Sequence, residues 1–523
     1  MSIPIITGVL VEASLLRGYD DYVGGLGLGA DAAGLRHRQA KAFLAAHPDL
    51  GAWMARPLDA RLVDLARTKA WPLITWAVLT RRVTADVDLL VSRHLGGMHR
   101  AAEAMFPTDF AAIRQSAERL GWGPRWAEHV VVYPLTLAVA WSGRPPAGLA
   151  DADIDALASA VEASPVVPAA RRARHRRDLG RLRQVLFEAR IVDRAHQPIR
   201  TTARGVAGYL NGVAAPEVRR VMLAYLDARR PVLRPGSLSG VANDLACFGE
   251  FLTAQHPELG TLAELGRHHV ESFCQWAPHR PHRGSKSRGR KVSASAAAHS
   301  VITLRTFLDD IAAWGWAEAP ARRLMFAADI PRQPRPLPRA LAPDIDAAVM
   351  AAVAGIDDRF ARTGLTVIRG TGLRAGELVD LELDCVVDYG AGGTWLQVPL
   401  GKLATERAVP LDDPTLAALD EWIAERGPQR ALPHPRHGRP ADFLFVEHGR
   451  RLPTARLRRG LAQAVRSAGL TGPGDGPLQV TPHQLRHTYA TGLEPSGVAL
   501  DATLSRSRER WGARTLGEGV AAE

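Results

Sequence analysis

The segment IPRQPRPLPRALAP, residues 330–343, contains five prolines in fourteen residues and divides the chain. Proline fixes φ and has no backbone N–H, so such a run fits neither a helix nor the interior of a sheet. We expect residues 331–343 to be an extended linker between domains, with its arginines facing outward.

Basic residues dominate the charge of the 523-residue chain, whose formal net charge is +12. Almost all of them are arginine, and arginine offers a planar fork of donors that suits phosphate oxygens. A polyanionic partner such as nucleic acid is one explanation. A GC-rich coding sequence would also raise the arginine content, so charge alone leaves both explanations open.

The cysteines and the first residues of the chain indicate the cellular compartment to expect. Three scattered cysteines, Cys247, Cys274 and Cys385, fit a reducing compartment without a disulfide framework. The first residues lack a basic segment ahead of an apolar run, and no apolar run approaches the roughly 20 residues that cross a bilayer. We expect a cytoplasmic protein with no membrane partner.

Helical periodicity of apolar residues runs through two blocks before the linker. Residues 1–225 are predicted to be a mostly helical N-terminal region, whose very basic stretch 171–190 either lies on a nucleic-acid backbone or is a solvated helix face. Residues 226–330 form a second helical block, interrupted by a basic loop rich in Gly and Ser that could follow phosphates. The loop residues predicted to contact DNA are Arg283, Lys286, Arg288, Arg290 and Lys291.

The block that begins near residue 344 mixes helices with short strands. TWLQVPL and ERAVPL are predicted to pair as a hairpin through the turn GKLATE. The predicted fold class is therefore mainly α with a small antiparallel β-sheet (α+β), in a multidomain chain. Lys402 lies in that turn and is the sole lysine of the block. A lysine can release a proton near neutral pH when its pKa is lowered, and an arginine cannot.

The densest cluster of reactive side chains is VTPHQLRHTYATG, residues 480–492. Its Thr-Pro pair is typical of a helix start, which puts His483, Arg486 and His487 at positions i, i+3 and i+4 on one face. Arginine binds phosphate oxygens and histidine moves protons, so this face suits a phosphate.

Zinc is the competing interpretation of the same helix, because the two histidines have HxxxH spacing. Gln484 stands where a zinc hydrolase has its glutamate base, and the sequence shows no third ligand, so we expect no metal here. Cys274, His279 and His282 form an equally weak metal pattern. For His487 alone, a capping or packing role is a plain alternative.

A second cluster, RGTGLRAGELVDL, places Arg374 at a helix start with Glu377 one turn on, after a helix end at Gly372. The Arg374–Glu377 pair could also be an ordinary surface ion pair. Taken together, the pieces resemble the tyrosine recombinase (phage integrase) family. Its TGLR..EL helix start, its hairpin lysine and its H.LRHT.AT box occur in the right order between residues 344 and 500.

The resemblance implies a catalytic domain at residues 344–500 and a helical core-binding (SAM-like) DNA-binding domain at residues 226–330. It implies double-stranded DNA as partner, together with further copies of the chain on DNA or an intact homologous recombinase. The location implied is the cytoplasm of a bacterium, at the nucleoid. A mobile element is one setting for such an enzyme.

The resemblance also implies roles for single residues. Arg374 and Arg486 would hold the non-bridging oxygens of the scissile phosphate and offset the charge of a pentavalent transition state. Lys402 would protonate the 5′-hydroxyl leaving group, and His483 would transfer a proton with the nucleophile.

Two further residues would act in support under this resemblance. Glu377 would be structural and would buttress Arg374, whereas His487 would follow the second arginine of the site as it does in many relatives. Because two guanidiniums supply the electrostatic stabilisation, the family chemistry requires no metal and no other cofactor.

This sequence differs from the family pattern at the nucleophile. Family members attack DNA with a tyrosine that lies several helical turns after the second arginine. Here the last tyrosine is Tyr489, where relatives carry a packing aromatic. No LGH-like box follows, and residues 501–523 are predicted to be a degenerate, disordered tail.

Two functions of different class remain at this point. The first is a site-specific DNA recombinase or integrase that grips the scissile phosphate and is defective in strand cleavage by itself. The second is a non-catalytic DNA-binding protein that occupies recombination sites, or that acts with an intact homologue donating its tyrosine in trans.

Overall fold

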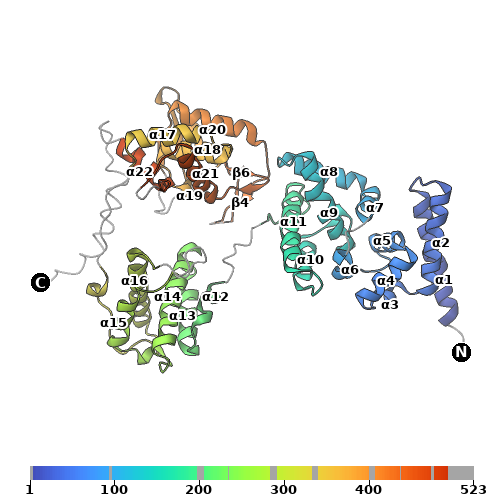
Figure 1. Ribbon diagram of the computed structural model, residues 1–523, viewed down its shortest axis with the longest axis horizontal. Coiled ribbons are helices and arrows are strands. Elements are labelled where there is room, and N and C mark those ends of the chain that lie inside the picture. The colour runs from blue at the N-terminus through green and yellow to red at the C-terminus, as the bar shows by residue number, and fades with distance from the viewer. Residues whose placement is uncertain are drawn as a thin grey trace. The chain divides into compact units, whose positions relative to one another are not determined.

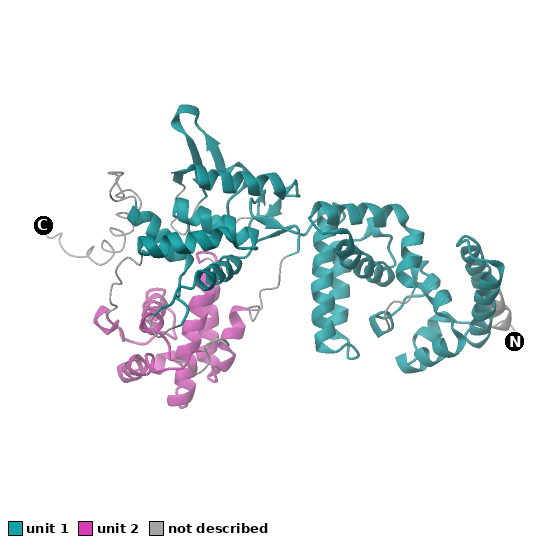
Figure 2. Ribbon diagram, turned by 45° about the horizontal axis from the view of Figure 1, so that its top comes forward, with its two compact units in different colours: residues 1–197, 338–523 teal, residues 198–337 magenta. Residues whose placement is uncertain are grey.

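The computed structural model describes residues 4–92, 97–196, 205–233, 235–282, 291–331, 340–399, 407–435, 438–472 and 476–492. It divides into two compact units, residues 198–337 and the remainder of the chain (Figure 2). The predicted fold class is confirmed, because helices predominate and the described strands form small antiparallel sheets after the linker. Within the described residues, no helix combines the length and the apolar character that crossing a membrane requires.

The N-terminal region is an array of helices around one apolar core (Figure 1). Helix α9 is central, because α7, α8, α10 and α11 pack against it and most of its residues are buried. This burial explains its nearly unbroken apolar sequence. The helices are α1 (Pro4–Gly24), α2 (Ala30–Ala46), α3 (Leu50–Met54), α4 (Leu58–Thr68), α5 (Trp71–Leu79), α6 (Val87–Ser92), α7 (Met98–Met105), α8 (Pro107–Arg119), α9 (Pro124–Ser142), α10 (Asp151–Ala163) and α11 (Ala169–Glu188).

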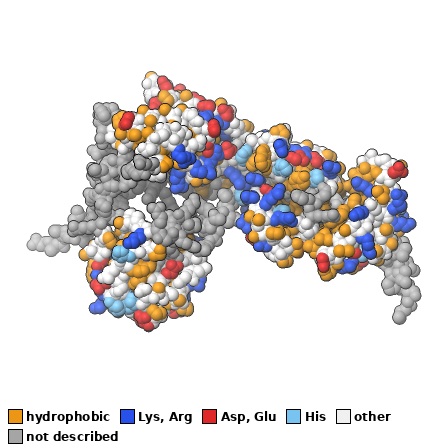
Figure 3. Space-filling view, viewed as in Figure 1, with side chains coloured by type: hydrophobic (Ala, Val, Ile, Leu, Met, Phe, Trp, Pro, Cys, Tyr) orange, Lys and Arg blue, Asp and Glu red, His pale blue; other side chains and the backbone are white. Residues whose placement is uncertain are grey.

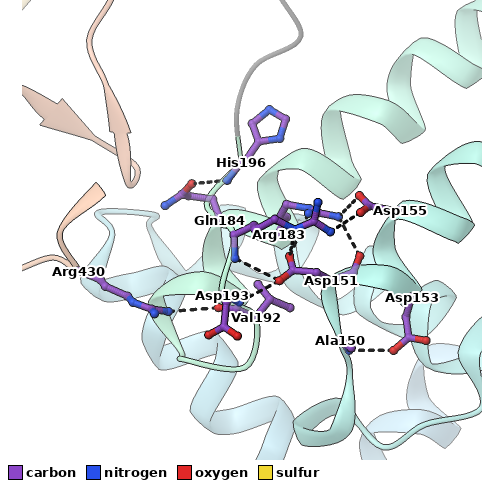
Figure 4. Close-up of polar contacts among 11 residues, drawn as sticks. Ala150, Asp151, Asp153, Asp155, Arg183, Gln184, Val192, Asp193, His196 and Arg430 are labelled. Atoms are coloured by element: carbon purple, nitrogen blue, oxygen red, sulfur yellow. Dashed lines mark hydrogen bonds and ion pairs between the residues drawn. The ribbon is translucent and has the colours of Figure 1, made fainter. Parts of the chain in front are cut away.

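Helix α11 carries the very basic stretch, and several of its arginines are engaged within the protein. Arg176 pairs with Glu162 at 2.7 Å, and Arg183 pairs with Asp151 at 3.0 Å (Figure 4). Arg172 donates to two backbone carbonyl oxygens. The basic composition of α11 therefore has a structural explanation for these three side chains, and DNA contact by the helix stays a prediction.

The second unit has its own core, in which aromatic rings pack edge to face. The ring centroids of Phe248 and Phe273 lie 5.1 Å apart. Its core begins at Leu210, so its first two helices precede or span residue 226, where the sequence-based division starts this domain. The helices are α12 (Val206–Tyr209), α13 (Pro216–Arg229), α14 (Pro235–Gln255), α15 (Arg267–Trp276) and α16 (Ala294–Ala313).

Most of the basic loop and of the linker lies outside the described residues. This applies to Arg283, Lys286, Arg288 and Arg290, and to residues 332–339. Lys291 is described, is exposed, and forms an isolated antiparallel bridge with Pro281. Its contact with DNA stays a prediction.

The block after the linker is built around α18 (Arg359–Thr371), against which α17 (Pro343–Ala354), α20 (Asp413–Arg426), α21 (Thr454–Ser467) and α22 (Pro482–Gly492) pack. A short helix, α19 (Ala375–Leu378), follows α18. Strands β1 (Val386–Asp388), β2 (Thr394–Val398) and β3 (Arg407–Pro410) form an antiparallel sheet in that order. Val398 pairs with Arg407, so the predicted antiparallel pairing is confirmed.

Two small ribbons connect this block to the N-terminal region within the first unit. They are β4 (Leu432–Pro433) with β5 (Pro440–Ala441), and β6 (Val446–Glu447) with β7 (Arg450–Arg451). Their buried residues Leu432, Ala441 and Val446 belong to the same apolar core as the N-terminal helices. The N-terminal region and the ribbons thus share one core.

Candidate active site

The end of helix α18 determines where the candidate site begins. Gly372 has a left-handed φ of 65°, and its amide donates to the carbonyl oxygen of Ile368 at 3.0 Å. A Cβ atom on Gly372 would lie 2.5 Å from Cδ1 of Tyr489 in α22. Only glycine suits both the backbone conformation and this close approach. The predicted helix end is confirmed, and the contact brings the segment of Arg374 beside α22.

Arg374 starts helix α19, as predicted, and is tied to Glu377. Its backbone amide donates to the Glu377 carboxylate at 3.0 Å, and its Nη1 donates to the same carboxylate at 2.6 Å. Glu377 is only 3% exposed. The alternative of an ordinary surface ion pair is therefore wrong, because the acidic partner is buried.

A second arginine, Arg407 of β3, completes the environment of Glu377 with an ion pair of 2.8 Å. Burial alone would raise the pKa of Glu377, but hydrogen bonds from Arg407 and Arg374 outweigh burial and lower the pKa to about 2. The carboxylate therefore stays charged at neutral pH and holds both guanidiniums in place.

Sequence reasoning missed Arg407. A signal was available, because side chains alternate along a strand and Arg407 lies two residues before the buried Val409. An arginine on the buried face of a strand needs an acidic or polar partner. That rule predicts an inward role for Arg407 without naming Glu377 as its partner.

Arg486 lies on α22, between the buried residues Leu485 and Thr488. Burial, followed by the positive charge of Arg374, lowers the pKa of Arg486 to about 10. Its Nη1 atom is buried and has no hydrogen-bond partner among the described residues. Buried polar groups are almost always paired, so this guanidinium has capacity for an additional acceptor, and the neighbouring charges favour an anionic one.

His483 and His487 stand next to one another on α22, with ring centroids 4.4 Å apart. Burial and the positive charges of His487, Arg486 and Arg374 lower the pKa of His483. The imidazole of His483 is therefore neutral at pH 7 and can accept a proton. The structure thus brings together five of the predicted residues, Arg374, Glu377, His483, Arg486 and His487, and adds Arg407.

Comparisons with known proteins identify the family of this chain. Residues 343–503 match the family model described as the phage integrase family. The tyrosine recombinase XerD of Mycobacterium tuberculosis is 30% identical over 283 residues, which cover 53% of this chain and 83% of that protein. The chain belongs to the tyrosine recombinase family.

Other relatives are similar over a shorter span. The tyrosine recombinase XerC of Serratia marcescens is 31% identical over 223 residues, covering 41% of this chain and 64% of that protein. A solved structure of the XerH site-specific recombinase bound to palindromic difH substrate aligns with a TM-score of 0.40 and 17% identity, over 57% of this chain and 88% of that chain.

Tyr489 has a packing position. Its ring contacts Gly372, and it lies against the core of the block after the linker. Burial raises the pKa of its hydroxyl, which makes the phenolate harder to form. Lys402 and all residues after Gly492 lie outside the described residues.

The residues considered as metal ligands in the sequence do not form a group of three potential ligands within the described part of the chain. The one group of potential ligands there is His256, Glu258 and His269, in the second unit. His269 uses Nδ1 to accept the backbone N–H of Gly266 at 2.9 Å. Its other ring nitrogen then carries the proton of the neutral imidazole and offers no lone pair to a metal.

Proposed function

We propose that this tyrosine recombinase binds duplex DNA and grips one phosphodiester between Arg374 and Arg486, as a site-specific recombinase or integrase. The observation that carries the proposal is the Nη1 atom of Arg486, which is buried and unpaired among the described residues. Arg374 supplies the neighbouring positive charge and is itself fixed by Glu377. A tetrahedral anion with several acceptor oxygens satisfies both guanidiniums at once.

The same arrangement suits the transition state of phosphoryl transfer. Negative charge grows on the equatorial oxygens as a fifth oxygen approaches phosphorus, and two fixed guanidiniums stabilise that charge without reorganising. A neutral His483 can take a proton from the attacking group and return it in the reverse step. Lys402 remains our candidate for protonating the 5′-hydroxyl leaving group.

Cleavage by this chain alone is proposed to be defective. Residues 490–523 contain no tyrosine, and Tyr489 is packed against Gly372. The packed position of Tyr489 favours a second candidate function, in which the protein occupies recombination sites or receives a tyrosine in trans from an intact homologue.

The partners we propose are double-stranded DNA and further recombinase subunits, in the bacterial cytoplasm at the nucleoid. Basic side chains gather along the lower edge of the block after the linker on the face drawn in Figure 3. Such a surface supports backbone contact with DNA, and the basic loop that contains Lys291 is expected to make DNA contacts of its own.

A cleavage assay tests the proposal once a target site is found by selection from randomised duplexes. With a nicked suicide substrate, we expect duplex binding and no covalent adduct from the purified protein alone. Arg374→Ala and Arg486→Ala should each weaken binding to the selected site by about 1–3 kcal/mol, whereas Arg362→Ala, on the earlier part of α18, should not.

Each outcome of this assay separates the candidates. An adduct that forms only when an intact homologue is present indicates donation in trans. An adduct from the protein alone contradicts the proposed defect in cleavage. If both active-site variants bind like the parent, the proposed grip on the phosphodiester is wrong.

A further inference from the structure

Arg450 shares with Arg486 a property that sets both apart from the other described arginines. Each has a terminal guanidinium nitrogen that is buried and has no hydrogen-bond partner among the described residues, Nη2 in Arg450 and Nη1 in Arg486. The remaining arginines with a buried unpaired nitrogen lack a partner only at Nε. These are Arg61, Arg219, Arg229, Arg280, Arg305 and Arg359.

The ribbon that carries Arg450 is held firmly against the N-terminal region. The ring of His448, at the turn between β6 and β7, stacks on Trp122 with centroids 3.8 Å apart and an interplanar angle of 16°. The next residue, Gly449, has φ 69°, and a Cβ there would lie 2.7 Å from Cγ of Gln184 in α11. The turn therefore packs against both Trp122 and α11. Arg450 is the next residue after this turn.

The surroundings of Arg450 are rich in positive charge. The guanidinium carbon of Arg181 lies 5.6 Å from the centre of the same Trp122 ring that His448 stacks on. His196 lies against α11 at Gly180, next to Arg181, since a Cβ there would come within 2.5 Å of the imidazole. Figure 4 shows His196 donating its backbone N–H to Gln184 of α11.

The pKa values of Arg450 and His196 agree with their place among other basic residues. Burial and the charge of Arg181 lower the pKa of Arg450 to about 10. Burial and the charges of Arg450 and Arg183 lower the pKa of His196 to about 4. Both are directions expected for basic groups that are partly buried beside other basic groups.

The carboxylates closest in sequence to Arg181 and to Arg450 do not pair with Arg450. Asp178 pairs with Arg181 at 3.3 Å, and Glu447 pairs with Arg456 at 2.6 Å. The pKa of Arg450 is shifted by burial and by Arg181, with no carboxylate among the causes. A buried guanidinium nitrogen without an acceptor is costly, and an anion that accepts from Nη2 of Arg450 removes that cost.

We propose that Arg450 and Arg181, where the β6–β7 ribbon meets α11, form a second oxyanion site that takes a phosphate group. Guanidiniums from two separate elements match the several oxygens of a phosphate. Arg450 lies on β7, whereas Arg374 precedes α19 and Arg486 lies on α22. The proposed second site is therefore on other elements than the proposed grip on the scissile phosphodiester. The phosphate could be free in solution or belong to a DNA backbone.

Calorimetric titration of inorganic phosphate into the full chain, against sodium chloride at constant ionic strength, tests the site. Protein with Arg486→Gln should retain phosphate binding, and adding Arg450→Gln should remove most of what remains. Thermal unfolding supplies a second readout, because phosphate should raise the melting temperature of the Arg486→Gln protein clearly more than that of the double variant. Equal phosphate binding with and without Arg450→Gln would overturn the proposal.

Arg430 provides a matched control at the same contact between the two regions. Its guanidinium donates to the carbonyl oxygens of Phe187 at 2.8 Å and Val192 at 3.2 Å, so it has partners within the protein. Arg430→Gln should lower the melting temperature equally in chloride and in phosphate. A loss of phosphate binding in Arg430→Gln as large as in Arg450→Gln would show that the contact as a whole matters, and would count against a site at Arg450.

Duplex DNA distinguishes the two sources of the phosphate. If the group belongs to a DNA backbone, Arg450→Gln should reduce by about one the slope of log affinity against log salt for a random-sequence duplex. If the phosphate is free in solution, that slope should not change while inorganic phosphate binding is lost. An unchanged slope together with unchanged phosphate binding would exclude the site.

Discussion

Glu377 is the residue on which the geometry of the candidate site depends most. Its buried carboxylate accepts from both Arg374 and Arg407 and keeps a charge there at neutral pH. Replacing one partner of a buried pair leaves the others uncompensated, which costs far more than the pair itself contributes. The roles of the two arginines can therefore be tested through the acid between them.

Glu377→Gln should lower the free energy of unfolding at pH 7 by about 3–5 kcal/mol. The folded-state pKa of Glu377, about 2, is below its ordinary value of 4.5. The stability that this group contributes is therefore present above about pH 4.5 and is lost as the pH falls towards 2. Urea unfolding of parent and variant between pH 7 and pH 3 should show the difference narrowing below pH 4.5.

Glu421→Gln is the matched control, since its carboxylate is 56% exposed and lies 3.7 Å from Arg362. Its effect should stay within about 0.5 kcal/mol at every pH. A difference between the parent and Glu377→Gln that does not change with pH would contradict the assignment of Glu377 as a charged buttress.

At the scale of elements, the contact between the end of α18 and helix α22 positions the site. Gly372→Ala should reduce the free energy of unfolding by about 2–4 kcal/mol, from the left-handed backbone and from the displacement of Tyr489. Gly372→Ala should also weaken phosphate binding, because Arg374 follows Gly372 and Arg486 precedes Tyr489, the two residues in contact.

Gly376→Ala serves as control within the same segment. Gly376 is exposed in α19, and a Cβ there meets nothing within 4 Å. This variant should be neutral or up to about 1 kcal/mol more stable, as expected for alanine in a helix. Similar losses in both glycine variants, measured by chemical denaturation, would contradict a specific role for the Gly372–Tyr489 contact.

At the scale of the whole molecule, the sequence predicted those features that a local pattern of residues encodes, namely single helices, one strand pairing and one helix end. Apolar periodicity predicted the helices, two short strand-like segments joined by a turn predicted the β2–β3 pairing, and a glycine between two helical stretches predicted the end of α18. Two motifs more than a hundred residues apart supplied Arg374 and Arg486. Their assembly into one site was predictable only through the resemblance to a family.

Contacts between distant segments escaped prediction, because no local period records them. The backbone amide of Arg430 donates to Glu188, 242 residues earlier in the chain, and the β6–β7 turn packs on Trp122. Neither contact leaves a repeat or a charge pattern in the sequence. The same holds for α12 and α13, whose periodicity predicts helices but does not say which core they join.

The most direct test of the central claim is a double-mutant cycle for phosphate binding with Arg374→Gln and Arg486→Gln. Arg450→Gln is included in all four proteins, so that the second proposed site does not contribute to the calorimetric signal. If the two guanidiniums hold one anion, each single change should weaken binding, and the double change should cost clearly less than the sum of the two. Losses that add, or single variants that bind phosphate like the parent, would contradict a shared phosphate site.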